Sequence, residues 1–424
     1  GRFQFEQAEL EIIFLAQDLV RISWGPAPEP VPYASARQDW PPVEFSLNQV
    51  DSGWVCSSSE LTVTIDQEGD LDFRSASGEH LRSDLSPQRY LIAEETTAWK
   101  QYGQLEPEEH LFGLGEQSGP LNLRGSFHRI WNTDTGGSYG PGMDPLYMPL
   151  PVYLSLRQTG SSLVFYENSF PAVFGFGPAR FPSRSRWIPP YPSRLQPTGL
   201  SHLESNRSLA YFAGGMLRYY FIPGSPHQVL ERFTELTGRA PLPPRWSLGY
   251  HQSRWGYRCE DDIREVVAGF NQHQLPLSAI HLDIDYMDGY RVFTVNRHCF
   301  PDLAGLANEL HGQGIRLVPI LDPGVKQDPE YEVFREGLKQ KVFCSLPDGQ
   351  PSVGQVWPGW CLFPDFTNPA ARRWWGSYYP RIHADGVDGF WHDMNEPSSF
   401  AAGGDLSLPV STQHHMEGRN GSHA

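Results

Sequence analysis

The sequence has few cysteines, no long apolar run and no excess of positive charge, and each of these absences excludes a class of protein. Its five cysteines among 424 residues lack C-x-x-C spacing, which argues against a zinc site and against a disulfide framework. No apolar run reaches the roughly 18 residues that a membrane-spanning helix needs, so no membrane partner is expected. Gly-rich phosphate loops and an EF-hand loop are also missing, so we expect neither an organic cofactor nor a bound metal.

The charge balance is acidic, with 33 Lys and Arg against 49 Asp and Glu and a net charge of −16. Because nucleic acid is itself a polyanion, we expect no nucleic-acid partner. The content of 39% hydrophobic and 13% aromatic residues is typical of a folded protein, and the length favours two or three domains. The N-terminus lacks the basic-then-apolar pattern of a signal peptide, so the cytoplasm is favoured while secretion stays open.

The first part of the chain, residues 1–238, has the pattern of an antiparallel β-sandwich domain. Short apolar or alternating runs such as 61–65 and 152–156 are separated by turn residues, and many of the 38 prolines and 41 glycines lie here. A helix is expected at 226–237. The stretch 238–245, with three prolines, then indicates a linker.

The second part, residues 239–424, has the strand–helix–strand rhythm of a parallel sheet, either open or closed. Two helices are predicted from apolar stripes at i, i+3, i+4 and i+7, one starting at Glu260 and one at Leu303. Four strands are expected, at 246–250, 280–284, 315–321 and 389–393. An inserted subdomain with a short helix near 329–337 is expected at about 325–388.

The predicted parallel strands end in acidic and aromatic residues. Polar groups at the carboxyl ends of parallel strands converge on one site. The second strand runs into Asp283 and Asp285, the third into Asp322, and the fourth into Asp393. Taken singly, an aspartate here is more often a helix cap or a turn former, and close acids could also hold a cation. Together with Trp255 and its neighbours, the four ends favour a pocket for carbohydrate chemistry.

The stretch Trp391–Ser398, with the sequence WHDMNEPS, closely resembles the signature of glycoside hydrolase family 31, the α-glucosidase family. Other stretches resemble motifs of the same family in the same order, namely GLGE at 113–116, WNTD at 131–134, RWGY at 254–257, LDIDYM at 282–287, VWPG at 356–359 and FPDFTNP at 363–369. The resemblance therefore extends from about residue 110 to the end. It implies a β-sandwich followed by the first half of a (β/α)8 barrel with an insertion after the third strand.

The resemblance also implies roles for individual residues. Asp393 matches the nucleophile, which forms a covalent glycosyl-enzyme intermediate, and Glu396 supports it by orienting the strand end. Asp283 matches the aspartate that binds hydroxyls of the terminal sugar. The other substrate-binding positions implied by the resemblance are Asp134 from a sandwich loop and Trp255, Ile284, Ile320, Trp357, Trp391 and Met394 from the barrel.

The function expected from the resemblance is that of a retaining exo-α-glucosidase acting on maltose-like oligosaccharides. An α-transglucosidase or α-xylosidase is the alternative within the family. A non-catalytic sugar-binding fragment and a metal-dependent hydrolase are alternatives from other classes.

A retaining glycosidase needs a second carboxyl group as acid/base, and no residue of this sequence matches the family's acid/base. In the family this acid/base lies well beyond the nucleophile, and only four of eight barrel strands are counted here. We therefore expect the N-terminal part of a longer enzyme, cut in the loop 411–424 and associated with a C-terminal fragment. If the chain acted alone, Asp365, Asp385 and Asp388 would be the nearby acid candidates, and none of them is favoured.

Overall fold

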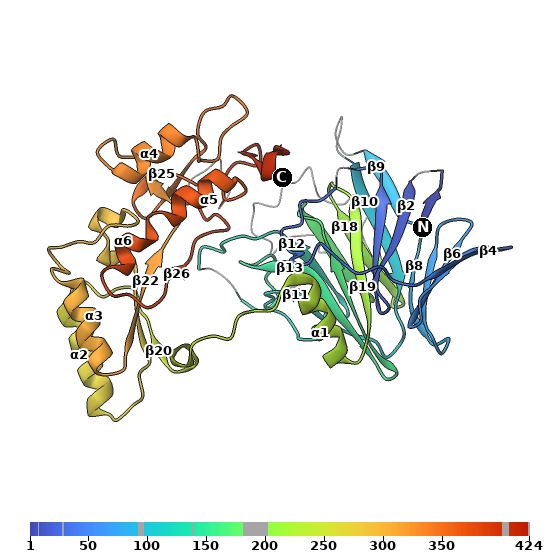
Figure 1. The fold of residues 1–424 in the computed structure, drawn as a ribbon, viewed down its shortest axis with the longest axis horizontal. Helices are drawn as coiled ribbons and strands as arrows, with labels where there is room; N and C mark the ends of the chain where they lie inside the picture. The colour runs from blue at the N-terminus through green and yellow to red at the C-terminus, as the bar shows by residue number, and fades with distance from the viewer. Residues whose placement is uncertain are drawn as a thin grey trace. The chain divides into compact units, whose positions relative to one another are not determined.

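The computed structural model describes residues 1–422 except 7, 28, 92–96, 138–139, 181–201 and 401–406. The chain divides into two compact units, Gly1–Ala240 and Pro241–Ala424 (Figure 1). Among the described residues, no helix is both long enough and apolar enough to cross a membrane. The domain limits expected from the sequence, 1–238 and 239–424 with an inserted subdomain at about 325–388, stay predictions.

The N-terminal unit consists of two antiparallel sheets. Within the described residues, the first sheet has the order β1 (Arg2–Gln4), β2 (Glu9–Ala16), β3 (Leu19–Gly25), β19 (Leu217–Gly224), β14 (Gly160–Tyr166), β13 (Pro149–Arg157) and β11 (His110–Gly115). The second has the order β12 (Ser126–Ile130), β15 (Ala172–Phe176), β18 (Arg207–Phe212), β10 (Thr97–Gln104), β8 (His80–Asp84), β7 (Leu71–Ser75), β6 (Leu61–Asp66), β5 (Gly53–Ser57) and β4 (Ser46–Val50), with β9 (Gln88–Leu91) also on β10. A small ribbon pairs β16 (Ala179–Arg180) with β17 (His202–Leu203).

The two sheets share one apolar core. Strand β6 alternates buried and partly exposed residues along its whole length, as a strand with one covered face must. Phe73 of the second sheet contacts Phe221 of the first, with ring centroids 4.7 Å apart, and Trp24 and Trp99 are fully buried. The predicted β-sandwich is confirmed.

The helix α1 (Pro226–Thr237) closes this unit and has the predicted limits. Ser225 and Gln228 form a capping box, and Pro226 occupies the first helical position, where no backbone N–H is needed. Val229 and Leu236 are buried on the helix face that packs with Leu163 and Ile222 of the sheet.

The C-terminal unit contains a four-stranded parallel sheet in the part of the chain that the structure describes. Its order is β20 (His251–Gln252), β21 (Ala279–Leu282), β22 (Arg316–Leu321) and β26 (Trp391–His392). The helices α2 (Glu260–Gln272) and α3 (Leu303–Gly312) lie side by side and are joined by a 2.9 Å ion pair between Arg264 and Glu309 (Figure 1). Both helices were predicted from their apolar stripes, and the predicted first half of a barrel is confirmed.

The first predicted strand of this sheet was placed wrongly. Residues Arg245–Leu248 form a 3-10 helix, and the strand begins only at His251. The backbone N–H groups of Ser247 and Gly249 donate to the carbonyls of Pro244 and Trp246, so local bonds replace a sheet ladder there. The fourth strand is also shorter than the expected 389–393.

Between β22 and β26 the chain forms a layer that the periodicity predicted only in part. It contains β23 (Val325–Lys326), α4 (Glu332–Gln340), β24 (Val353–Val356), β25 (Gly359–Leu362), α5 (Pro369–Gly376) and α6 (Tyr379–His383). After β26, the strands β27 (Gln413–His414) and β28 (Gly421–Ser422) pair as a hairpin. Of the helices in this layer, only α4 was expected.

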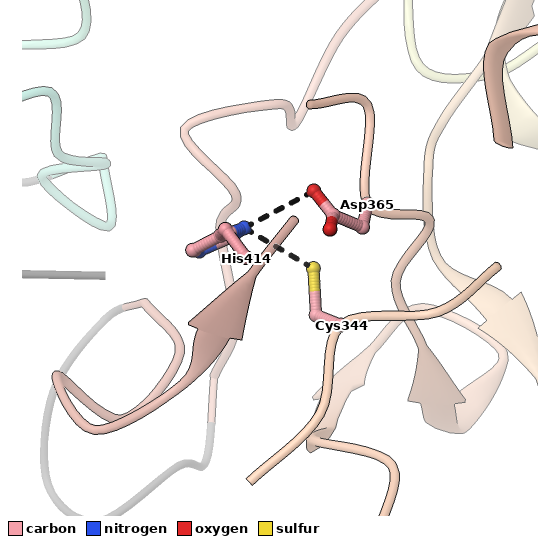
Figure 2. Close-up of side chains that lie close together, drawn as sticks. All are labelled: Cys344, Asp365 and His414. Carbon is pink, nitrogen blue, oxygen red and sulfur yellow. Dashed lines mark hydrogen bonds and ion pairs between the residues drawn. The ribbon is translucent and has the colours of Figure 1, made fainter. Parts of the chain in front are cut away.

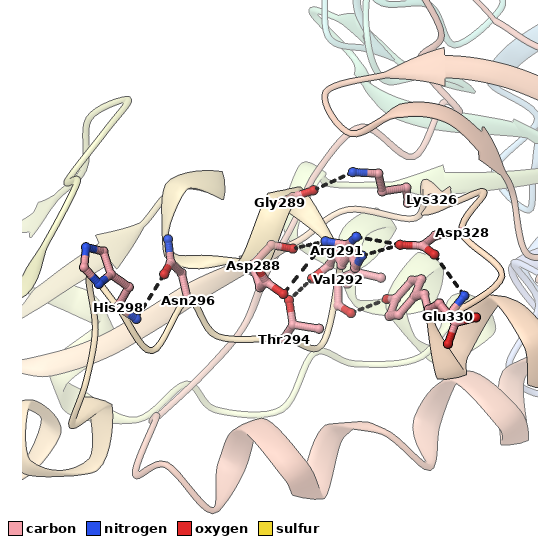
Figure 3. Close-up of polar contacts among 11 residues, drawn as sticks. Asp288, Gly289, Arg291, Val292, Thr294, Asn296, His298, Lys326, Asp328 and Glu330 are labelled. Atoms are coloured by element: carbon pink, nitrogen blue, oxygen red, sulfur yellow. Dashed lines mark hydrogen bonds and ion pairs between the residues drawn. The ribbon is translucent and has the colours of Figure 1, made fainter.

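An ion pair ties the loop after β21 to this layer (Figure 3). Arg291 donates through Nε and an Nη to one oxygen of Asp328, and these bonds hold the pKa of Asp328 below its usual value. Thr294 accepts from the backbone N–H of Asp288, and Lys326 donates to the carbonyl of Gly289. The loop that follows Asp283 is therefore held by side chains of the next segment.

Candidate active site

The acidic strand ends lie side by side because the strands are parallel and in register. Ile320 pairs with Trp391 and Leu321 pairs with His392, so Asp322 and Asp393 are the next residues on adjacent strands. On the other side, Leu282 of β21 pairs with Pro319, and Asp283 follows it directly. The carboxyl ends of three neighbouring strands thus bring three aspartates to one edge of the sheet.

Asp393 lies in a sharp turn at the end of β26. Its Oδ1 accepts the backbone N–H of Met394 at 2.8 Å, and Met394 has a left-handed φ of 61°. The turn is closed further by a bond from the Ser398 N–H to the Met394 carbonyl. Asp393 itself is partly exposed.

Asp283 caps the short 3-10 helix Ile284–Tyr286 through a 2.7 Å bond from the Ile284 N–H to its Oδ1. Burial raises the pKa of Asp283, the backbone bond opposes this shift, and the charges of Asp285 and Asp393 add to it. The effect of the Asp393 charge on the pKa of Asp283 indicates that these two carboxyl groups belong to one electrostatic cluster.

Asp322 is the most buried acid of this cluster, with 9% of its surface exposed. Among the described residues, its Oδ1 has no hydrogen-bond partner. Burial, followed by the charges of Asp393, Asp283 and Glu396, raises the pKa of Asp322 to about 8. This shift favours the protonated form of Asp322, which can donate a hydrogen bond. Asp322 was expected at a strand end but without a role, because its position beside Asp393 depends on strand register.

Aromatic rings gather beside this cluster. The rings of Trp255 and Trp357 lie 5.2 Å apart and both side chains are exposed, by 65% and 39% respectively. Phe400 packs edge-on against Trp357 at 4.8 Å. Trp357 also lines a small cavity together with Ile284 and Asp322. Three of the predicted binding residues and the unassigned Asp322 are thus brought to one region.

The remaining predicted positions of the barrel unit differ in exposure. Ile284 and Ile320 are buried in the apolar core of this unit, and Trp391 is partly buried against His281. Glu396 lines a cavity of about 180 Å³ with its neighbours Asn395 and Pro397 and with residues of the preceding layer.

Asp134 lies in the N-terminal unit, where its carboxylate accepts the Gly136 N–H at 2.7 Å. Its predicted role at the barrel stays a prediction.

The three other acids considered as acid/base candidates have structural contacts. Asp385 forms an ion pair with Arg297 at 2.9 Å. Asp388 accepts from His311, Arg316 and the Leu317 N–H, so it lies at the amino end of β22, opposite to Asp322. Asp365 accepts from Thr367 and from the His415 N–H, and its Oδ1 lies 3.3 Å from Nδ1 of His414. These contacts agree with favouring none of the three as the acid/base.

Gly256 is required by the close approach of Asp285. A Cβ added at Gly256 would lie 1.8 Å from Asp285 Oδ2, and Tyr290 donates to Oδ1 of the same carboxylate at 3.3 Å. Gly256→Ala should therefore displace Asp285 and cost about 1–3 kcal/mol of stability.

The matched control for this prediction is Gly269→Ala in helix α2, where an added Cβ meets nothing within 4 Å. This change should stabilise the protein by up to about 1 kcal/mol, because alanine favours the helix. Unfolding in urea gives the free energy of unfolding of each variant. Equal effects of the two substitutions would contradict the assigned role of Gly256.

Fold and site together define a class of protein, the enzymes that carry their reactive carboxylates at the carboxyl edge of a parallel barrel. Two family models match this chain: the "Glycosyl hydrolases family 31 TIM-barrel domain" over residues 240–423 and the "Glycosyl hydrolase 31 N-terminal galactose mutarotase-like domain" over residues 9–174. The chain belongs to glycoside hydrolase family 31.

Several known proteins are similar to this chain. Alpha-glucosidase 2 of Bacillus thermoamyloliquefaciens is 36% identical over 94% of the chain, and an alpha-glucosidase of Saccharolobus solfataricus is 30% identical over 88%. The chain spans 48% and 47% of these two relatives, about half of their length. A GH31 dextranase of Flavobacterium johnsoniae, solved with glucose, shares the fold with a TM-score of 0.81 at 24% identity, over 97% of this chain and 48% of that one.

Proposed function

We propose that this chain carries the nucleophile and part of the sugar-binding site of a retaining exo-α-glucosidase that acts on maltose-like oligosaccharides. The observation that carries the proposal is the position of Asp393 beside Asp283 and Asp322 at the carboxyl edge of the sheet. Asp393 would attack the anomeric carbon, and a covalent glycosyl-enzyme intermediate would form as the leaving group departs.

The other groups of the site support binding of a sugar ring. Asp283 would accept hydrogen bonds from its hydroxyls, and the protonated Asp322 would donate one. The exposed faces of Trp255 and Trp357 suit the C–H surfaces of a sugar, and Glu396 would orient the turn after the nucleophile. Two relatives named as alpha-glucosidases, at 36% and 30% identity, support glucose as the terminal sugar.

A second candidate is an α-xylosidase, because Alpha-xylosidase 1 of Arabidopsis thaliana is 33% identical over 70% of the chain. Xylose lacks the hydroxymethyl group of glucose, so the two activities differ in one contact of the pocket. Relative kcat/KM on matched α-glucoside and α-xyloside substrates separates them. Analysis of the products from concentrated maltose separates hydrolysis from transglucosylation.

We also propose that further polypeptide completes the barrel and supplies the acid/base. The sheet of the C-terminal unit has four parallel strands within the described residues, whereas a closed barrel has eight. The relatives are about twice as long as the chain, which supports this proposal. Because the acids Asp365, Asp385 and Asp388 already have structural partners, the second carboxyl is expected from that further part.

The direct test is inactivation of the chain, together with the further polypeptide that completes its barrel, by a mechanism-based α-glucosyl label, followed by peptide mapping. Label on the peptide that contains Asp393, together with release of the α-anomer as the first product, is the expected result. Release of the β-anomer, or label on another acid, would overturn the proposed mechanism. Sugar binding without turnover would favour a non-catalytic fragment instead.

A further inference from the structure

Three side chains outside the proposed sugar site form a mixed sulfur, nitrogen and oxygen cluster: Cys344, Asp365 and His414 (Figure 2). One potential ligand atom of each lies within 4.8 Å of the others. Cys344 and Asp365 are 3% and 5% exposed. Figure 2 shows His414 between the other two, with contacts to both. No step of the proposed mechanism uses this cluster.

The distances fit a shared metal ion better than a hydrogen bond. Nδ1 of His414 lies 3.3 Å from Oδ1 of Asp365 and 3.7 Å from Sγ of Cys344. A single Nδ1 proton can serve only one of these two acceptors, and the contact to Oδ1 is longer than the usual N–H···O distance of about 2.9 Å. In a tetrahedral zinc site with ordinary bond lengths, the N–O edge is about 3.3 Å and the N–S edge about 3.6 Å. The observed separations match those edges.

The backbone holds the three residues in place before any ion binds. Phe343 and Ser345, on either side of Cys344, form antiparallel bridges with Pro364 and Gln413 respectively. Asp365 and His414 are the next residues after those two bridge partners. Three chain segments are thus paired side by side, so metal binding costs little conformational entropy.

The carboxylate of Asp365 is oriented as metal-binding carboxylates usually are. Thr367 donates to Oδ1 through its N–H and its hydroxyl, and His415 donates its N–H to Oδ2. These bonds fill three of about four acceptor sites, two on Oδ1 and one on Oδ2, so one acceptor site on Oδ2 is left for a metal ion. A cavity of about 180 Å³ adjoins the three side chains and has room for a water as fourth ligand.

We propose that Cys344, Asp365 and His414 bind one Zn²⁺ ion, with a water molecule in the fourth position. The set contains one thiolate, one carboxylate and one neutral imidazole, so two negative charges balance the ion. When the metal binds, a Zn–S bond forms and the thiol proton passes to solvent, while His414 keeps its proton on Nε2. The ion would fasten the β27–β28 hairpin to the layer before β26. This proposal does not rest on the proposed enzymatic function.

The test is metal binding by the isolated, tag-free protein after its metals have been stripped. Titration with Zn²⁺ against a chromophoric chelator should give one tight site per chain. Co²⁺ should occupy the same site and produce a sulfur-to-cobalt charge-transfer band in the near ultraviolet, which Zn²⁺ then removes. Absence of tight binding, or a bound Co²⁺ without the thiolate band, would overturn the proposal.

Substitutions identify the ligands. Cys344→Ser should abolish the band, whereas Cys361→Ser, which alters an equally buried thiol in the same apolar cluster, should retain it. The less buried His414→Gln provides a second variant: Zn²⁺ should raise the Tm of the wild type but not of His414→Gln. Loss of the band in Cys361→Ser alone, or an equal Tm increase in both proteins, would contradict the assignment.

Discussion

Asp393→Asn is expected to lower the hydrolysis of α-glucosides by at least about 10⁴-fold. An amide cannot form the covalent bond to the anomeric carbon, yet it keeps the size of the carboxylate and can still accept the Met394 N–H. Substrate should therefore still bind. The measurements are kcat on an aryl α-glucoside and the Kd of a substrate that is not turned over.

Chemical rescue separates a lost nucleophile from a misfolded site. With α-glucosyl fluoride as substrate, azide should restore turnover of an Asp393→Ala variant, whose smaller side chain leaves room for it, by direct attack with release of fluoride, giving the inverted β-glucosyl azide. Asp385→Asn is the matched control, because that carboxylate pairs with Arg297 away from the strand ends. It should keep wild-type kcat. An α-configured azide product from Asp393→Ala would contradict the nucleophile assignment.

Helices with a complete periodic apolar stripe were predictable from the sequence. Short helices, and segments where local hydrogen bonds replace a strand, were not. Helices α2 and α3 carry complete apolar stripes, so periodicity alone predicted them. The helices α5 and α6 are eight and five residues long, too short for such a stripe to stand out. At 246–250, apolar content suggested a strand, but the 3-10 bonds that follow Pro244 take precedence there.

The site was predictable to the extent that it lies next to strand ends. Asp283 and Asp393 were expected at the carboxyl ends of the strands 280–284 and 389–393, and the family resemblance adds their roles. In the structure the strands end earlier, at Leu282 and His392, so both aspartates follow them directly. The environment of Asp322 could not be predicted, since its burial and its charge interactions with three other acids depend on strand register. The cluster of Cys344, Asp365 and His414 had no sequence signal, because bridges between distant segments bring these residues together.

Asp322→Asn is expected to stabilise the protein at neutral and mildly alkaline pH, by about 2–4 kcal/mol near pH 7.5. In the unfolded chain an aspartate ionises near pH 3.9, whereas in the folded protein the pKa of Asp322 is raised to about 8. Between these values the folded state holds a proton that the unfolded state has released. The wild type therefore loses stability as pH rises through this window, and the loss is complete above the folded pKa.

The neutral amide of the variant matches the protonated acid in shape and carries no such penalty. The difference in unfolding free energy, measured in urea, should be small near pH 4.5 and reach its full size near pH 8. Asp385→Asn, which removes a surface ion pair, should change stability by under about 1 kcal/mol. A stability gain for Asp322→Asn that does not grow with pH would show that Asp322 is already ionised in the folded protein. In that case Asp322 would enter the site as a second negative charge beside Asp393 and could not donate a hydrogen bond to a sugar hydroxyl.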